Sequence, residues 1–301
     1  MPKTSKRAIQ APPTDSLDYG RKRSQWRDVL HRLTRNKLAM LGLVIVLVLV
    51  LAAVFADFVA PYDPDVQDYT NMKAYPSFAH PLGTDDVGRD TLSRIIYGGR
   101  VSLLVSILSI VFGLVVGGII DVSAGYFGGV YDGVIMRVMD VIMAIPGFLL
   151  AVCISSALGQ GIFNTALAIG IGCVPGYARL LRALVLGIRD QEYVEAARVT
   201  GASNARIMFR QIVPNILSPV IVDSTLRIGG CILMISSLSF IGLGVQPPTA
   251  EWGSMVAEGR EVIRSFWPMS TFPGLAIMLT LFGFNLFGDG LRDALDPKLK
   301  N

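Results

Sequence analysis

Charged residues are scarce in this chain of 301 residues. Asp, Glu, Lys and Arg together make up 17% of the sequence, whereas a soluble domain usually has about 25%. Hydrophobic residues account for 52%, and the mean hydropathy is +0.53. This combination excludes an ordinary water-soluble domain and predicts that lipid surrounds much of the chain.

Cysteine and histidine are also few, which excludes two kinds of site. Cys153, Cys173 and Cys231 lie singly in apolar runs, so the sequence has neither a disulfide framework nor a CxxC metal-ligand spacing. We interpret these thiols as small hydrophobic groups that pack between helices. His31 and His80 lie far apart in polar segments, so we expect no metal site.

Motifs for nucleotide binding and hydrolysis are absent as well. The sequence has no GxxxxGK(S/T) phosphate loop, so it cannot supply the backbone cradle and the lysine that hold ATP phosphates. It also has no HExxH zinc motif, no serine nucleophile elbow and no paired intramembrane aspartates. We therefore expect no catalytic residues and no cofactor on this chain.

Long apolar runs predict six membrane spans. A span needs about 20 apolar residues, because a helix rises 1.5 Å per residue through a hydrocarbon core of roughly 30 Å. The first run is residues 38–56, before Pro61, and the second is residues 101–120. Asp121 follows the second run, and we interpret it as a residue that reaches the membrane surface or caps the helix. The sixth span is predicted at about residues 272–287.

The third and fourth spans are predicted from one unusually long run. Residues 141–178 contain no charged side chain, and this length is too great for a single crossing. Residues 159–161 (GQG) interrupt the run with two glycines. They predict a tight turn between two antiparallel helices.

The fifth span has two alternative positions. Residues 216–238 begin after Pro214 but include Asp223 and Arg227, whereas residues 228–244 avoid both charges. The second half of the later segment is rich in Ser and Gly, which is more typical of a turn, so we favour 216–238. Asp223 and Arg227 share a helix face and can pair. A purely structural pair and a lining of the translocation path both remain open.

Basic residues are distributed unequally between the two sides that six spans define. Of the 27 lysines and arginines, 20 lie on one side, six lie on the other, and Arg227 lies within a span. The richer side comprises both termini, the loop after the second span and the loop after the fourth. Because basic residues favour the cytoplasmic side, both termini are predicted to be cytoplasmic. This clustering argues against nucleic-acid binding, which needs a basic stripe.

The predicted spans divide the chain into five parts. Trp26, Leu30 and Leu33 recur at helical spacing among basic residues, which is typical of an amphipathic elbow helix on the membrane surface. The parts are a cytoplasmic tail with this elbow (1–37), the first span (38–60), an extracytoplasmic loop (61–100), a core with five spans (101–290) and a cytoplasmic tail (291–301).

The cytoplasmic loop at about residues 189–215 predicts two helices separated by a break. Gly201 can adopt the left-handed conformation that ends a helix. Ser203 or Asn204 can then cap the next helix, and Pro214 suits the first turn of the helix that enters the membrane. We therefore predict a helix-turn-helix that protrudes from the bilayer.

This loop resembles the EAA loop of ABC importer permeases. The matching residues are Glu195, Ala196, Ala197, Gly201 and Pro214. In that family the loop forms a short cytoplasmic helix that docks in a cleft of the ATP-binding subunit. The resemblance therefore implies that these residues couple the chain to a separate ATPase through a helix-in-groove contact.

The end of the loop departs slightly from the family pattern, which reads Ile-x-Leu-Pro. Gln211 stands at the Ile position and Val213 at the Leu position. We expect these exchanges to alter the docking geometry slightly, and we keep the assignment of this segment as an EAA loop.

Four further stretches narrow the resemblance to one group of importers. They are residues 82–90 (LGTDDVGRD), 125–129 (GYFGG), 239–248 (SFIGLGVQPP) and 288–297 (GDGLRDALDP). In this order they are similar to the C-type permease subunit of the dipeptide, oligopeptide and nickel importers. The resemblance extends from about residue 25 to the end of the chain.

The resemblance implies an all-α, polytopic protein with the type I ABC importer permease fold, in the bacterial plasma (inner) membrane. Such a subunit forms half of the translocation pathway. Its implied partners are a second homologous permease subunit, one or two ATP-binding cassette subunits, an extracytoplasmic substrate-binding protein and the lipid bilayer. Peptide, nickel-chelate, glutathione-like and opine importers share this pattern, so the cargo stays open, with dipeptides and oligopeptides as the working expectation.

The alternative function is a secondary transporter or channel subunit that is not coupled to ATP. Such proteins are commonly built from internal repeats with broken helices at the membrane midplane. The predicted spans show no such symmetry. We therefore favour the importer subunit.

Overall fold

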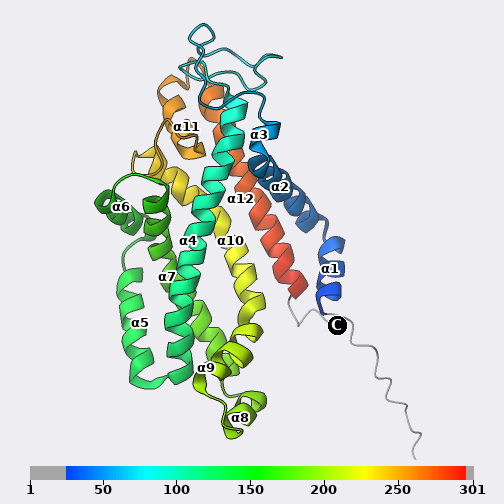
Figure 1. The fold of residues 1–301 in the computed structure, drawn as a ribbon, viewed down its shortest axis with the longest axis vertical. Helices are drawn as coiled ribbons and strands as arrows, with labels where there is room; N and C mark the ends of the chain where they lie inside the picture. The colour runs from blue at the N-terminus through cyan, green and yellow to red at the C-terminus, as the bar shows by residue number, and fades with distance from the viewer. Residues whose placement is uncertain (1–24, 296–301) are drawn as a thin grey trace, which may run out of the picture.

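The computed structural model describes residues 25–295, with side chains from Val29 onward, and this part of the chain contains helices and no strand. In chain order the helices are α1 (Gln25–Arg35), α2 (Lys37–Val54), α3 (Ala56–Val59), α4 (Thr91–Phe127), α5 (Gly129–Met143), α6 (Gly147–Leu158), α7 (Ile162–Ile188), α8 (Glu192–Val199), α9 (Asn204–Ile207), α10 (Val213–Phe240), α11 (Trp252–Gly259) and α12 (Pro268–Leu295). The outer parts of the predicted tails, 1–24 and 296–301, lie outside the described residues. The predicted all-α class is confirmed (Figure 1).

Five helical segments within residues 25–295 are long and apolar enough to cross a membrane. They are Lys37–Val54, Thr91–Phe127, Ile162–Ile188, Asn204–Phe240 and Pro268–Leu295. The pair α5 and α6 makes a sixth if the two bent helices count as one span. The structure thus describes a polytopic bundle with five to six apolar spans.

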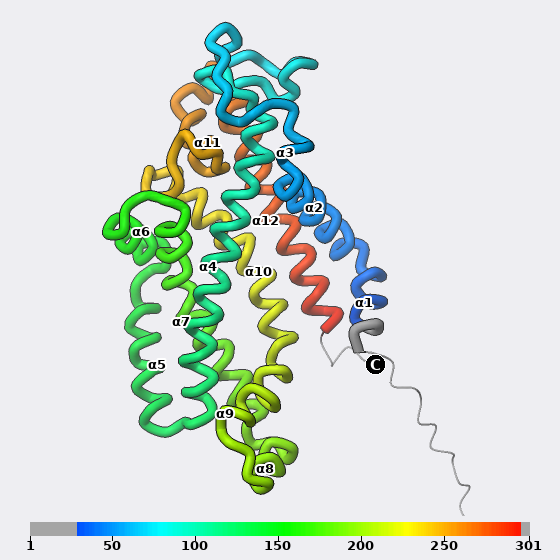
Figure 2. Tube along the Cα trace, viewed as in Figure 1, coloured from blue at the N-terminus to red at the C-terminus, as the bar shows by residue number. Residues whose placement is uncertain are grey.

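Close contact between α4 and α7 forms the centre of the bundle (Figures 1 and 2). Gly113 and Gly117 lie one turn apart on α4. A Cβ on Gly113 would lie 2.7 Å from Cβ of Cys173, and one on Gly117 would lie 3.1 Å from Cβ of Tyr177. Small residues at this spacing let two helix backbones approach closely in a membrane, where apolar burial alone does not drive helix association.

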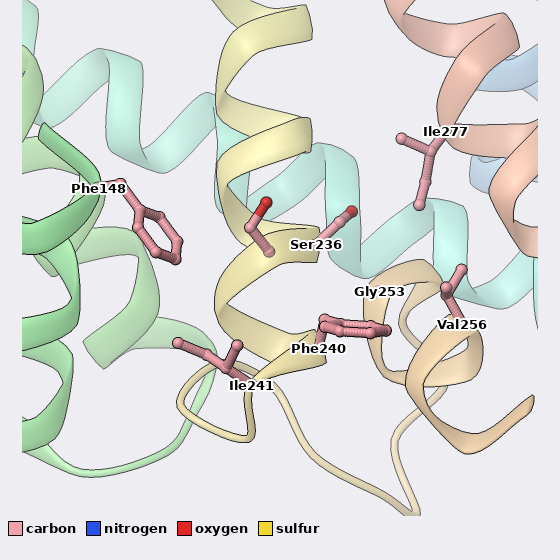
Figure 3. Close-up of a pocket in the computed structure, with 8 residues that line it drawn as sticks. Phe148, Ser236, Phe240, Ile241, Gly253, Val256 and Ile277 are labelled. Carbon is pink, nitrogen blue, oxygen red and sulfur yellow. The ribbon is translucent and has the colours of Figure 1, made fainter. Parts of the chain in front are cut away.

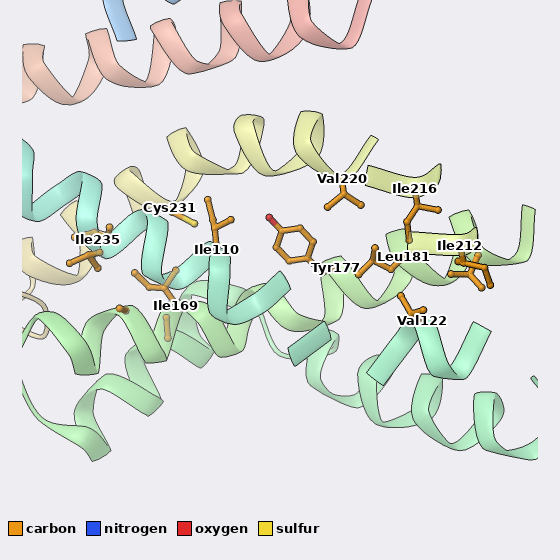
Figure 4. Close-up of a cluster of buried hydrophobic side chains, with 14 of the residues drawn as sticks. Ile110, Val122, Ile169, Tyr177, Leu181, Ile212, Ile216, Val220, Cys231 and Ile235 are labelled. Carbon is orange, nitrogen blue, oxygen red and sulfur yellow. The ribbon is translucent and has the colours of Figure 1, made fainter. Parts of the chain in front are cut away.

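A continuous apolar cluster links α4 and α7 to α10 and to the loop below them (Figure 4). Ile110 and Val122 come from α4, and Tyr177 and Leu181 come from α7. The residues that α10 and the π-helical turn before it (Met208–Ile212) contribute include Ile212, Ile216, Val220, Cys231 and Ile235. The cluster therefore ties α10 to the central pair along much of its length.

The second span is longer than predicted. The apolar run predicted residues 101–120, whereas α4 extends over Thr91–Phe127 and is capped by Asp90, whose carboxylate accepts a hydrogen bond from the Ser93 N–H at 2.8 Å. The prediction stopped at Arg100, whose guanidinium in fact pairs with Asp57 at 2.8 Å. α4 therefore begins ten residues before the boundary predicted at residue 101, because paired charges are tolerated within a helix end.

The third span is not the straight helix that the apolar run predicted. α5 begins at Gly129, twelve residues before the predicted run, and α6 is bent from it by 86°. Pro146 precedes α6 and has no N–H to continue the helix. The predicted span began after the last charged residue, at 141, whereas α5 includes Asp132 and Asp140. These two carboxylates pair with Arg182 and Arg179 of α7. The turn predicted at residues 159–161 is present, since α6 ends at Leu158 and α7 begins at Ile162.

The fifth and sixth spans follow the predicted order, with different ends. α10 is continuous over Val213–Phe240 and includes Asp223 and Arg227, so one helix contains both charges, as the first alternative requires. α12 extends to Leu295. The helix therefore continues for five residues past the boundary predicted between core and tail at residue 291.

The elbow predicted before the first span corresponds to α1. Leu33 is buried against Ala39 of α2 and Ala294 of α12, whereas Leu30 remains 61% exposed. The side chain of Trp26 lies outside the described residues. One flank of α1 therefore rests on protein.

Residues 60–90 and 241–267 gather at one end of the bundle, which we call the cap (Figure 1). The Tyr75 hydroxyl donates to the Ser265 carbonyl at 3.2 Å, and the Trp252 indole N–H donates to the Ile95 carbonyl at 2.8 Å. α8 and α9 lie at the opposite end. The cap and the α8–α9 loop are thus separated by the full length of α4.

Buried charges hold the two parts of the cap together. Arg89 pairs with Asp85 at 2.5 Å and with Glu258 of α11 at 3.5 Å. Arg94 is fully buried and lies 3.6 Å from the carboxylates of both Asp85 and Glu258. Burial raises the pKa of Glu258, and the two arginines oppose this rise. Removal of one charge from this cluster would leave another buried without its partner.

Candidate functional site

The first candidate site is α8, which projects from the end of the bundle opposite the cap (Figure 1). Val194 is completely buried in the main apolar cluster and anchors the helix. Glu195 and Ala196 are exposed, and Ala197 is half-buried. α8 is therefore fixed along one side, while its other side presents the residues that the sequence predicted for the coupling contact.

Gly201 ends α8 as predicted. Its φ is +80°, and its N–H donates to the Arg198 carbonyl at 3.1 Å, while the Ala202 N–H donates to the Ala197 carbonyl at 3.1 Å. These two bonds form a Schellman motif, in which glycine avoids the Cβ clash of the left-handed conformation. The Ser203 hydroxyl then accepts from the Arg206 N–H at 3.3 Å and caps α9. Of the two caps left open by the sequence, Ser203 is the one used.

The C-terminal end of α4 contacts the α8–α9 loop through Tyr126. The Tyr126 hydroxyl donates to the Asn204 side-chain carbonyl at 3.0 Å, and the Arg198 guanidinium lies 5.9 Å from the Tyr126 ring centroid. Arg189, at the end of α7, donates to the Gly125 carbonyl at 3.0 Å. The loop is thus attached to α4 and α7 by polar contacts as well as through Val194.

The sequence prediction missed Tyr126 and Arg189 as supports of the loop. Tyr126 lies in the stretch 125–129 (GYFGG), which was recognised only as part of the family pattern. An aromatic residue directly after a glycine, six residues past the predicted second span, was a signal that could have been followed. Its partner Asn204 is 78 residues away, and no local pattern indicates such a contact.

Pro214 lies in the first turn of α10, as predicted, but the helix does not start there. α9 continues through the π-helical turn Met208–Ile212 into α10. Pro214 cannot donate to the preceding turn, and a π-helical turn is a common way to accommodate such an interruption. The loop is therefore joined to α10 by helix without a flexible connector.

Two large apolar side chains near the loop are left uncovered. Val199 is 88% exposed and Phe209 is 72% exposed. Both belong to the same protruding region as Glu195 and Ala196. Exposed apolar residues beside polar ones are typical of a protein contact surface.

The second candidate site is the pair formed by Asp223 and Arg227 in α10. The Arg227 Nε donates to the Asp223 carboxylate, as the i, i+4 spacing predicts. The Arg227 guanidinium also lies 4.8 Å from the ring centroid of Tyr177 in α7. Gly176 allows this approach, since a Cβ there would lie 2.9 Å from an Arg227 nitrogen.

The pair is not fully buried within the described chain. The side chains of Arg227 and Asp223 are 31% and 30% exposed. Charges inside a membrane span normally face a bundle interior or a water-filled path. The uncovered side of the pair is therefore better suited to water or another protein chain than to lipid.

The comparisons with known proteins agree with this geometry. The family described as "Binding-protein-dependent transport system inner membrane component" matches residues 109–301, which include α8 and all of α10. The family described as "N-terminal TM domain of oligopeptide transport permease C" matches residues 24–81. The chain belongs to the binding-protein-dependent transport permease family. It is therefore the permease subunit of an ABC importer, a transport component and not an ATPase.

Similar permeases are known from several bacteria. The chain is 45% identical to the di/tripeptide transport system permease protein DppC of Pseudomonas aeruginosa, over 92% of each chain. It is 43% identical to the glutathione transport system permease protein GsiD of Escherichia coli O6:K15:H31, over 97% of this chain and 96% of the relative. It is 42% identical to the dipeptide transport system permease protein DppC of Alkalihalophilus pseudofirmus, over 92% and 91%.

Asp121 of the permease neither caps a helix nor reaches the surface of the described structure, so the sequence interpretation of this residue is wrong. It lies within α4, is completely buried, and neither carboxylate oxygen has a hydrogen-bond partner among the described residues. α4 continues to Phe127, which places Asp121 inside the helix and not at its end. Nearby, Arg182 of α7 forms two hydrogen bonds to Asp132 of α5, at 2.5 and 2.6 Å.

Within residues 25–295 the structure brings together no group of three or more His, Cys, Asp or Glu residues that could hold a metal ion. Cys173 and Cys231 face each other between α7 and α10 with their sulfur atoms 4.0 Å apart. Cys153 is exposed on α6. The permease therefore presents two candidate sites, the α8–α9 loop and the charge pair of α10.

The charge pair gives a first prediction. Asp223→Ala or Arg227→Ala leaves one charge in α10 without its partner, which costs about 3–5 kcal/mol at a fully buried site and less here because each side chain is about one third exposed. We expect each single variant to lower the amount of assembled permease more than the double variant does. Thermal unfolding in detergent and the yield of purified complex measure this difference.

Thr225→Ala is the matched control, since the Thr225 hydroxyl bonds only to the Ile221 carbonyl of its own helix. We expect it to behave as wild type. Wild-type assembly and uptake in both single variants would contradict a coupled pair. Normal assembly without uptake in the double variant would instead favour a lining of the translocation path.

Proposed function

We propose that the permease forms half of the translocation path of an importer for short peptides, driven by a separate ATPase. Three relatives that the chain matches over 90% or more of their length are named for di/tripeptide, glutathione or dipeptide transport. Glutathione is itself a tripeptide. Identity to the peptide and glutathione permeases differs by only a few per cent. This similarity supports short peptides as a class and does not favour one member of it.

The observation that carries the coupling proposal is the exposed, firmly attached α8. The permease has no phosphate loop of its own, so ATP energy must reach it through a contact with another chain. Glu195 and Ala196 are exposed on α8, and Val199 beside them is 88% exposed. We propose that residues 195–201 dock in a groove of the ATP-binding cassette subunit.

Movement of the docked helix would reach the membrane by two routes. One runs through Asn204 and Tyr126 to α4. The other runs through the π-helical turn into α10, which carries Asp223 and Arg227. Both routes consist of helix and direct contacts. No flexible segment lies along them to absorb a displacement of α8 before it reaches α4 and α10.

The proposed orientation places the α8–α9 loop and both termini in the cytoplasm of a bacterium and the cap outside its plasma membrane, with six spans. The 20 basic residues on one side and six on the other support it. The partners that we propose are a second homologous permease, one or two ATP-binding cassette subunits, and a substrate-binding protein that delivers cargo at the cap. α8 and the cap lie at opposite ends of the bundle (Figure 2), which suits two partners on opposite sides of the membrane.

The coupling contact gives a second prediction. In a variant without its native cysteines, Ala196→Cys or Val199→Cys should cross-link to a cysteine in the groove of the ATPase subunit, because both positions are exposed on α8. Gel electrophoresis of the intact complex detects the product. Phe78→Cys in the cap, fully exposed at the other end, is the control that should give no product. If neither α8 position cross-links while the complex is intact, the coupling proposal is wrong.

The orientation gives a third prediction. Lys73 is exposed in the cap, and every other lysine lies at residues 3–37 or 298–300. A membrane-impermeant amine reagent should therefore label Lys73 in intact spheroplasts and label the remaining lysines only after the membrane is disrupted. Mass spectrometry of peptides separates the two groups, and Lys73→Arg should abolish the first signal. Labelling of Lys37 without Lys73 in intact spheroplasts would show that the orientation is inverted.

The cargo gives a fourth prediction. The permease reconstituted in proteoliposomes with its second permease, ATPase and binding protein should accumulate a labelled dipeptide only when ATP is supplied on the ATPase side. Excess unlabelled tripeptide should compete, whereas free amino acids should not. Uptake without ATP would favour the secondary-transporter alternative, and the absence of any peptide uptake would contradict the peptide assignment.

A further inference from the structure

The Asp223–Arg227 pair leaves three hydrogen-bonding atoms free. Its one hydrogen bond joins the Arg227 Nε to one carboxylate oxygen of Asp223, Oδ2. Among the described residues, the second carboxylate oxygen, Oδ1, and the two terminal guanidinium nitrogens, Nη1 and Nη2, form no hydrogen bond. None of these three atoms is buried, and each side chain is about one third exposed. The pair therefore presents a free acceptor beside free donors.

α7 holds the Arg227 guanidinium in a fixed orientation. The guanidinium carbon lies 4.8 Å from the ring centroid of Tyr177, which is completely buried and whose hydroxyl donates to the Ser224 hydroxyl of α10 at 2.9 Å. Gly176 leaves the space for this stacking, because a Cβ there would lie 2.9 Å from Nη1. A guanidinium stacked on an aromatic ring keeps the N–H groups of its edge available for a carboxylate. The donors are thus oriented before any ligand arrives.

The pair lies on one uncovered face of α10, which we call the open face. It comprises Asp223, Arg227, Gly230, Ser237 and Ile241, which follow one another at intervals of four, three, seven and four residues. These intervals place them on one side of a helix with 3.6 residues per turn. Gly230 is exposed, with no atom within 4 Å of the place of a Cβ, and Ile241 is 48% exposed. The accessible face therefore continues from the charge pair to the cap end of α10.

The cap end of the open face borders an apolar pocket of about 370 Å³ between α6, α10, α11 and α12 (Figure 3). Ser236, Ser237 and Ile241 belong to its lining, together with Phe148 of α6 and Ile277 of α12. We assign no occupant to this pocket. It marks the cap end of the open face as uncovered, on the side at which cargo arrives in the proposed orientation.

We propose that the pair binds the two charged ends of the transported peptide. The peptide carboxylate accepts from the free guanidinium nitrogens of Arg227, and the peptide ammonium group donates to the free carboxylate oxygen of Asp223. The proposal rests on the proposed peptide function and assigns to it a contact within the membrane.

Charge complementarity is the physical reason for this contact. A short peptide carries both charges at neutral pH, because the pKa of a terminal carboxyl is about 3.3–3.7 and that of a terminal amine about 7.7–8.0. The pair also carries one charge of each sign. The peptide and the pair can therefore neutralise each other at a depth where an unpaired charge is costly.

A lipid headgroup can also carry both charges, but it matches the position of the pair poorly. Asp223 lies ten residues from the start of α10, and Arg227 lies thirteen residues from its end. At 1.5 Å per residue these separations are about 15 and 20 Å. Headgroups lie outside a hydrocarbon core of about 30 Å, so they do not reach the middle of this helix.

The test compares two dipeptides of opposite net charge, Ala-Glu and Ala-Lys, in the importer reconstituted with its second permease, ATPase and binding protein. Asp223→Asn leaves the positive charge of Arg227 and should raise the ratio of Ala-Glu to Ala-Lys uptake about three- to tenfold relative to wild type, as one unit charge close to another does. Arg227→Gln leaves the negative charge of Asp223 and should lower this ratio by a similar factor. The binding protein and the ATPase are the same in every sample, so their own preferences cancel.

Shifts of opposite sign distinguish a contact with cargo from general damage, which would lower both rates alike. Thr225→Ala is the matched control and should leave the ratio unchanged, because its hydroxyl bonds only to its own helix. If the wild type transports both dipeptides and the two variants do not shift the ratio in opposite directions, the inference is overturned while the peptide function stands. If the wild type transports neither dipeptide, the peptide function fails and this inference fails with it.

Photolabelling tests the same contact without a variant, in case a single variant does not assemble. A dipeptide with a diazirine side chain is added to the wild-type complex of both permeases and the ATPase in detergent, without the binding protein, and mass spectrometry locates the label. We expect label on α7 or α10 near Arg227. Excess dialanine should remove it, whereas N-acetyl-dialanine amide, which lacks both charges, should not.

The double variant Asp223→Asn with Arg227→Gln leaves no unpaired charge and should lose this label. Absence of label near Arg227 in the wild type, or equal competition by the blocked peptide, overturns the inference. Either result would instead favour the second permease as the cover of the open face.

Discussion

The close contact between α4 and α7 is the constraint on which the rest of the permease depends. Lipid does not drive apolar helices together as water does, so close approach at small residues and polar contacts must hold them. Gly113 and Gly117 allow that approach. α4 then extends from the buried charges of the cap, where Arg94 lies, to Tyr126 above the α8–α9 loop. One rigid helix therefore connects the two ends at which partners are proposed to bind.

Charges in the helices are tolerated because they are paired, either across the bundle or within one helix. Arg100 pairs with Asp57, Arg182 with Asp132, and Asp223 with Arg227. Each pairing removes most of the penalty for a charge away from water. Asp121 is the exception among these acids, since it is buried and its oxygens have no partner in the described structure. Pairing across helices explains why α4 and α5 are longer than apolar runs alone indicate.

α10 brings three features of the permease into one element. Its start is joined by helix to the α8–α9 loop, its middle carries Asp223 and Arg227, and its end carries Ser236 beside the apolar pocket. A displacement of the loop would therefore act on the charge pair and the pocket together. This continuity offers a physical route from the α8–α9 loop to the far end of α10.

Much of the architecture was determined by local sequence. The composition indicated the lipid environment. Gly201 and Ser203 predicted the turn between α8 and α9, and the i, i+4 spacing of Asp223 and Arg227 predicted their pair. Both of these features depend on neighbours along one helix or turn. The length of α4, the bend between α5 and α6, the burial of Asp121, the support from Tyr126 and the pocket at Ser236 were decided only by tertiary structure. Each of these depends on side chains from helices far apart in sequence, whose pairing and packing set the cost of a charge or the space around a hydroxyl.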